Sequence, residues 1–262
     1  MLFGMHPLVF LTVLIGFATD LAVAVIGFII VSGKTKSVKI LGLSFGVNGI
    51  IGIIQQACFV VRYLNPTPET VGKISSASNV VAAVSTLFSI LCICLFIHKN
   101  YGCKWIYFPL FAQPVVNAVS RIAFMAVLSR IGGEMMLIAG TGLSTGVTSL
   151  VTGTVTSIIL IVVFYKNRKN EKIIPHMWII RLITYCWGLI FTIVSIVFYA
   201  ACLRGGSDAE RIYIEQLNNF TKFQTVYTIL DAFVGIVMPI YILVMAKKAE
   251  KQPEETAAYI ED

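Results

Sequence analysis

The chain has 262 residues, of which 57% are hydrophobic and only 13% are charged, and its net charge is +7. A soluble domain carries about 25% charged residues, so this composition excludes an ordinary soluble domain and indicates a polytopic membrane protein. The cations lie beside the apolar runs, where membrane insertion explains them, and we expect no nucleic-acid partner. The expected environment is a lipid bilayer.

The apolar runs predict an all-α bundle of seven transmembrane helices. About 20 helical residues cross the hydrocarbon, and a helix satisfies all its backbone groups within one segment. The predicted spans are residues 7–32, 39–64, 74–97, 105–129, 136–165, 174–203 and 221–246. A single seven-helix domain would therefore cover residues 1–248, and residues 249–262 are expected to form a short cytoplasmic tail.

Lysine and arginine are shared unequally between the two sets of loops, and cytoplasmic loops normally carry the excess. One set of loops, together with the C-terminal tail, holds twelve of them: Lys34, Lys36, Lys39, Lys99, Lys104, Lys166, Arg168, Lys169, Lys172, Lys247, Lys248 and Lys251. The opposite set holds six: Arg62, Lys73, Arg130, Arg204, Arg211 and Lys222. We therefore expect the N-terminus outside and the C-terminus inside, in the cell (plasma) membrane.

Small residues are concentrated in the second and fifth predicted spans. The second contains Gly42, Gly46, Gly49 and Gly52. The fifth contains Gly142, Gly146 and Gly153 among the hydroxyl residues Ser144, Thr148, Ser149, Thr152, Thr154 and Ser157. Small residues let helix backbones approach closely, and hydroxyls hydrogen-bond across helices or to their own helix. Close packing is the simpler interpretation; the alternative is that the Ser/Thr face of the fifth span lines a cavity.

Ten polar or charged residues from different spans lie in the middle or outer half of the predicted bundle. They are Asp20, Asn48, Gln55, Gln56, Asn79, Asn117, Arg121, Tyr185, Trp187 and Asp231. A polar group facing lipid is costly, so we expect these residues to share one polar interior, close or open to the outside. This interior is the predicted ligand site.

Three of these residues are charged, namely Asp20, Arg121 and Asp231. One arginine cannot neutralise two carboxylates. Arg121 would pair with either aspartate or bridge both, which gives a structural ion pair that fixes helix order. The functional hypothesis is that the carboxylate left over, which we expect to be Asp231, serves a ligand or a proton.

No catalytic or metal-binding pattern is found. The loops are too short for a catalytic domain, and the three histidines, His6, His98 and His176, lie on scattered segments without metal-ligand spacing. We therefore expect no enzyme, no cofactor and no metal site. Asn219-Phe220-Thr221 matches the glycosylation sequon in an outer loop expected at about residues 203–221, although chance is the simpler explanation.

Three functions fit this pattern. The first is a seven-helix receptor or sensor that binds a small molecule from outside and contacts a cytoplasmic protein partner. The second is a small-solute or ion-coupled transporter that uses the intramembrane Asp and Arg residues. The third is a membrane scaffold without a ligand.

The twelve-to-six distribution of basic residues predicts the topology. In a background without the native cysteines, a cysteine at Ser207 should react with an impermeant maleimide added outside intact cells. A cysteine at Asn170 should react only after the membrane is opened. If both react from the same face, the seven-span topology is wrong.

Overall fold

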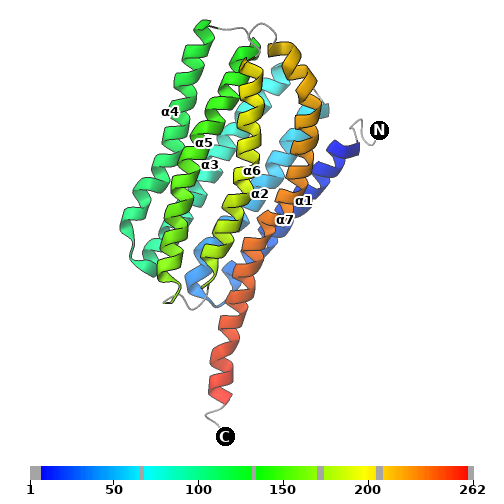
Figure 1. Ribbon diagram of the computed structural model, residues 1–262. Coiled ribbons are helices and arrows are strands. Elements are labelled where there is room, and N and C mark those ends of the chain that lie inside the picture. The colour runs from blue at the N-terminus through cyan, green and yellow to red at the C-terminus, as the bar shows by residue number, and fades with distance from the viewer. Residues whose placement is uncertain (1–6, 65–67, 132–133, 170–173, 205–208, 259–262) are drawn as a thin grey trace. The chain divides into compact units, whose positions relative to one another are not determined.

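The computed structural model describes residues 7–64, 68–131, 134–169, 174–204 and 209–258 (Figure 1). Some side chains in these ranges, those of Asn79 and Arg121 among them, lie outside the description. The described chain forms seven α-helices and two short 3-10 helices, and it contains no strand. The expected all-α class is confirmed.

The helices match the first two predicted spans and are longer than most of the others. They are α1 (Pro7–Ser32), α2 (Lys39–Leu64), α3 (Pro68–Tyr101), α4 (Tyr107–Ile131), α5 (Glu134–Asn167), α6 (Met177–Arg204) and α7 (Ala209–Ala258), with 3-10 turns η1 (Lys36–Val38) before α2 and η2 (Lys104–Ile106) before α4. α3 ends at Tyr101 and is followed by Gly102, whose φ of 69° is the left-handed conformation that terminates helices.

α7 differs most from the prediction. Its 50 residues include most of the segment 203–221, which was expected to be a loop, and the first part of the expected tail. The C-terminal one of these flanking segments is rich in Ala, Glu, Gln and Lys, which have high intrinsic helix propensity. Hydropathy located the apolar part of the helix but not its polar ends.

Six of the seven helices are long and apolar enough, in their described residues, to cross a membrane. The exception is α4, which contains Gln113, Pro114, Asn117 and Arg121. The chain is thus an integral membrane protein with six candidate spans by length and composition.

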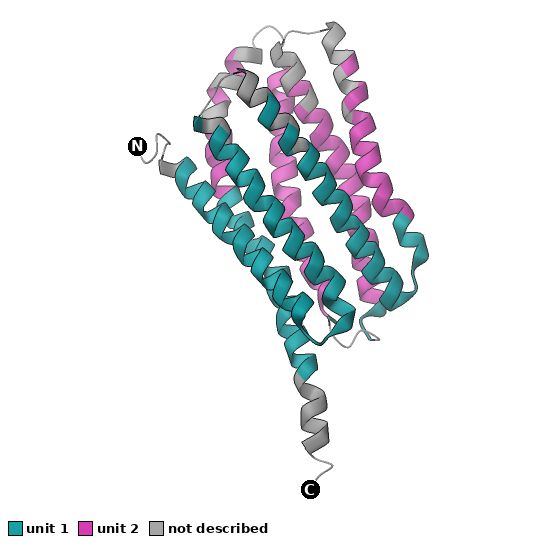
Figure 2. Ribbon diagram, turned by 180° about the vertical axis from the view of Figure 1, so that it is seen from behind, with its two compact units in different colours: residues 1–107, 167–175, 228–262 teal, residues 108–166, 176–227 magenta. Residues whose placement is uncertain are grey.

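The chain divides into two compact units, drawn in different colours in Figure 2. Unit 1 comprises residues 1–107, 167–175 and 228–262; unit 2 comprises residues 108–166 and 176–227. Unit 1 contains α1, α2, α3 and the second part of α7, and in it α2 packs against both α1 and α3. Unit 2 contains α4, α5, α6 and the first part of α7.

The contact between α1 and α2 is a close approach of two backbones. A Cβ atom added to Gly49 would lie 2.5 Å from both the Ala24 nitrogen and the Asp20 carbonyl oxygen, and one added to Gly42 would lie 2.9 Å from the Gly27 carbonyl oxygen. These distances are too short for real atoms, so only glycine permits this packing. The predicted role of the glycines in the second span, close helix packing, is confirmed.

Glu250 links the far end of α7 to the connection between α1 and α2. One oxygen of its carboxylate accepts hydrogen bonds from the Lys34 N–H, from the Thr35 N–H at 3.0 Å and from the Thr35 hydroxyl at 3.3 Å. The Thr35 hydroxyl also lies 3.2 Å from the Ala246 carbonyl oxygen. The polar extension of α7 is therefore attached to unit 1 instead of being a solvated tail throughout.

Aromatic rings join α6 to the first part of α7 in unit 2. Phe198 stacks on Phe220 with ring centroids 4.1 Å apart, and Trp187 stacks on Tyr227 at 4.9 Å. Between these pairs, Phe191 lies 4.7 Å from the Tyr227 ring. Because α6 and α7 run in opposite directions, rings at helical spacing on each meet in this reversed order.

The same substitution should have opposite effects at two helical glycines. Gly49→Ala places a methyl group against the backbone of α1 and should destabilise the protein by about 1–3 kcal/mol. Gly235→Ala on α7 meets no atom within 4 Å, so it should be neutral or stabilise by up to about 1 kcal/mol. Thermal melts of both variants in detergent measure this; equal melting temperatures would mean that α1 and α2 are not in close contact.

Candidate functional site

Asp20 and Gln56 are two residues of the predicted site that the described structure brings together. The Asp20 carboxylate lies where a side chain on Gly52 would otherwise be, and Gln56 hydrogen-bonds to it. The absence of a side chain at Gly52 therefore gives the carboxylate room within the contact between α1 and α2. A neutral amide, not a cation, is the partner that the structure describes for Asp20.

Asn48 is satisfied by serines of its own helix and of α3. Its amide nitrogen donates to the Ser89 hydroxyl at 2.7 Å and to the Ser44 hydroxyl at 3.4 Å, and its amide oxygen accepts from the Ser85 hydroxyl at 2.6 Å. This set uses most of the hydrogen-bonding capacity of the amide. Asn48 therefore fastens α2 to α3 inside unit 1.

The three predicted residues of unit 2 that are described also contact neighbouring helices. Asn117 on α4 accepts a hydrogen bond from Thr152 on α5 at 3.1 Å. Tyr185 on α6 lies 2.8 Å from the Thr154 hydroxyl on α5. The Trp187 carbonyl oxygen on α6 accepts from the Tyr227 hydroxyl at 3.4 Å.

Of the four remaining predicted residues, two have side chains that the structure describes. Gln55 is half-buried and Asp231 is exposed, both in unit 1. The side chains of Asn79 and Arg121 lie outside the described residues, so the ion pair proposed for Arg121 stays a prediction. Asn219 is exposed on α7, and its sequon lies within a helix, whereas glycosylated sequons normally lie in surface loops.

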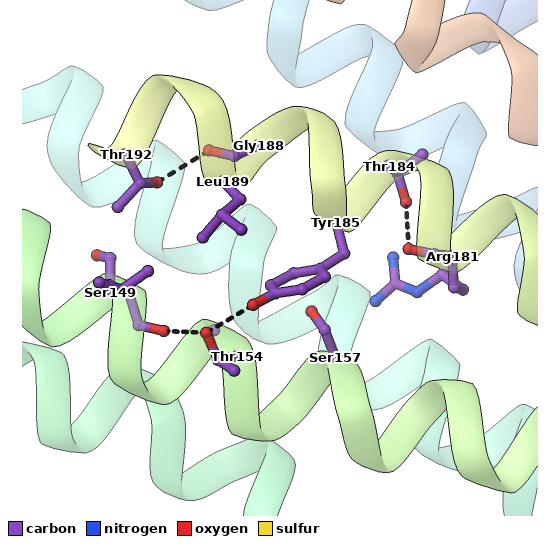
Figure 3. Close-up of a pocket in the computed structure, with 11 residues that line it drawn as sticks. Ser149, Thr154, Ser157, Arg181, Thr184, Tyr185, Gly188, Leu189 and Thr192 are labelled. Atoms are coloured by element: carbon purple, nitrogen blue, oxygen red, sulfur yellow. Dashed lines mark hydrogen bonds between the residues drawn. The ribbon is translucent and has the colours of Figure 1, made fainter. Parts of the chain in front are cut away.

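The clearest candidate site is a cavity of about 290 Å³ inside unit 2, between α5 and α6 (Figure 3). α5 contributes Ser149, Gly153, Thr154 and Ser157, which are residues of the Ser/Thr face that the sequence singled out. α6 contributes Arg181, Thr184, Tyr185, Gly188 and Thr192. At these positions the Ser/Thr face of α5 lines a cavity, which was the alternative interpretation of the sequence.

The same helix pair is packed closely elsewhere. An added Cβ would lie 2.5 Å from the Tyr199 ring at Gly142 and 2.8 Å from Ile196 at Gly146. At Gly153 and Gly188 it would meet no atom within 4 Å. The cavity thus arises where two glycines have no large side chain opposite them, while the other glycines of α5 serve packing.

Most hydroxyls of the cavity are already used as donors. Thr184 and Thr192 donate to carbonyl oxygens of α6, at 3.1 Å and 3.0 Å. Thr154 donates its only hydrogen to the Leu150 carbonyl oxygen, so Tyr185 is the donor in its bond to Thr154. For the Ser149 and Ser157 hydroxyls, no partner occurs in the described part of the chain.

Arg181 is the one charged residue of the cavity lining. It lies four residues after the start of α6 at Met177, about 6 Å along the helix, and its side chain is partly buried. Among the described residues, no hydrogen bond or ion pair reaches this guanidinium. In Figure 3 it points toward the space between α5 and α6, on the side of Tyr185 and Ser157.

Arg181 is not among the ten residues predicted from the sequence to form the site. The available signal was its spacing: Tyr185 and Gly188 follow on the same face of α6, at one and two turns. Whether this face of α6 borders a cavity or a packed side chain depends on the residues of α5 opposite it.

These observations define an all-helical integral membrane protein with a polar cavity between two of its helices. Comparisons with protein-family models, with curated proteins and with solved structures found no match. The described residues contain no group of three His, Cys, Asp or Glu side chains arranged to hold a metal ion.

Two adjacent glutamines offer a test of the Asp20 contact. Gln56→Leu removes the hydrogen-bond donor to Asp20 and should destabilise the protein by about 1–3 kcal/mol. Gln55→Leu, one position earlier on α2, should cost less than about 1 kcal/mol. In an Asp20→Leu background the effect of Gln56→Leu should largely disappear. Thermal melts of the single and double variants measure this, and purely additive losses would contradict the contact.

Proposed function

We propose that the protein is a small-solute transporter of the plasma membrane, with seven spans, an external N-terminus and a cytoplasmic C-terminus. α4 is the seventh span, since its 25 residues are long enough to cross the hydrocarbon despite its polar groups. The solute site is the cavity between α5 and α6. This cavity is the single observation that carries the proposal.

The size and lining of the cavity suit a small polar solute. A volume of about 290 Å³ is close to the lower limit of known ligand pockets, which is about 300 Å³. At the roughly 30 Å³ that a water molecule occupies in the liquid, it has room for about ten such groups. Hydroxyls, an aromatic ring and a cation supply the polar contacts that orient a ligand.

The position of the cavity favours transport over reception of an external ligand. It extends from the middle of α5 and α6 toward the C-terminal end of α5 and the N-terminal end of α6. In the proposed orientation this is the cytoplasmic half. An external ligand would have to pass through the bundle to reach it, as a transported solute does, whereas a receptor pocket was expected in the outer half.

The test is solute flux by the purified protein in phosphatidylcholine liposomes. Candidate solutes are lactate, inorganic phosphate, alanine and glucose, each offered radiolabelled on one side. Gly188→Leu and Gly153→Leu place a larger side chain in the open space of the cavity and should reduce flux at least tenfold. Val151→Leu is the matched control, because Val151 is on α5, is 58% exposed and does not line the cavity.

Flux in the wild type that both cavity-filling variants abolish, and that Val151→Leu retains, supports the proposal. Flux that all three variants retain would mean that the solute takes another path. Binding of a solute without any flux would instead support the receptor.

A further inference from the structure

We infer that the cavity between α5 and α6 binds the carboxylate or phosphate group of a small organic anion, with the Arg181 guanidinium as its counter-ion. This inference rests on the proposed function and names the class of solute. It starts from the free hydrogen-bonding capacity of the cavity lining.

That free capacity includes the donors of three residues, of which Arg181 has the most. Arg181 has five N–H groups and no acceptor, and no partner for its side chain occurs among the described residues. The Ser149 and Ser157 hydroxyls are likewise without a described partner and can each donate one hydrogen bond. A ligand that satisfies this lining must therefore accept several hydrogen bonds.

The charge of the lining selects an anion among such ligands. An unpaired arginine inside a membrane protein is costly, and residues of this kind normally pair with another charge. No carboxylate occurs among the described residues that line the cavity, so these residues offer no anion there. A carboxylate or phosphate would supply the missing charge, and its oxygens match the fork of N–H groups of arginine.

The depth of the site separates it from the membrane surface. The aromatic side chains of Tyr165 and Trp178, with ring centroids 5.2 Å apart, mark the interface end of α5 and α6. Ser157 lies eight residues further into α5 than Tyr165, about 12 Å along the helix. An anionic group held between Arg181 and Ser157 would be below the headgroup level, as expected for a solute in transit. The same chemistry also fits a lipid phosphate drawn inward, which the experiment must distinguish.

The first arm measures binding through the melting temperature of the purified protein in a neutral detergent. The anionic probes are lactate, benzoate, succinate and inorganic phosphate, and the neutral ones are lactamide and benzamide. At least one anion should raise the melting temperature, and its amide at the same concentration should not. Equal shifts with the amides, or no shift with any anion, would overturn the inference. Flux of alanine or glucose could still support the proposed function in that case.

The second arm uses Arg181→Gln. Without ligand, this variant should melt at or above the wild-type temperature, because it removes a partly buried charge for which the described residues offer no partner. Its affinity for the anion should be at least about 30-fold lower, as when one member of a buried charge pair is truncated. Arg181→Lys should fall between the two, since lysine keeps the charge and loses the fork. A large loss of stability in Arg181→Gln without ligand would show that Arg181 has a structural partner, and would also overturn the inference.

The third arm identifies the source of the anion. Phosphatidylglycerol in phosphatidylcholine nanodiscs is compared with the soluble anions. A shift with soluble anions alone supports the solute. A shift with phosphatidylglycerol alone that Arg181→Gln removes would assign the site to a lipid headgroup, and would contradict transport through this cavity.

Discussion

The cost of leaving a polar group unsatisfied inside a bilayer is the constraint on which this structure depends. Each described polar contact between spans lowers this cost by giving a polar side chain a hydrogen-bond partner on a neighbouring helix. Asn48 is held by serines on α2 and α3, and Asp20 by Gln56. On α5, Thr154 receives the hydroxyl of Tyr185. These contacts fix which helix faces meet, because a rotated helix would expose its polar group to lipid.

Arg181 is the exception, because it lines the cavity and has no partner among the described residues. The lining around it has hydroxyls but no carboxylate, and the glycines on either side leave space instead of filling it. Asp20, Asn48 and Tyr185 each have a neighbouring side chain as partner, whereas the described residues offer none to the Arg181 cation beside this open space. Such a site resembles binding sites in general, where hydrogen-bonding capacity is reserved for a ligand at a cost in stability.

Glycine has two different uses in this chain, and the sequence alone cannot separate them. On α2, Gly42 and Gly49 bring the backbone of α1 close. On α5, Gly142 and Gly146 accommodate side chains of α6, while Gly153 faces open space. All share small-residue spacing on an apolar helix. Their role depends on the size of the residue opposite, which belongs to another helix.

The sequence by itself determined the class of protein and nearly all helix positions, because hydropathy and span length are properties of one segment and need no partner. It also determined that Asp20, Asn48 and Tyr185 would need partners inside the bundle. Only the tertiary structure decided that these partners are neighbouring side chains, and that the open polar space lies beside Arg181. Hydrogen-bond partners and voids depend on which faces of two helices meet, and no single segment encodes both faces.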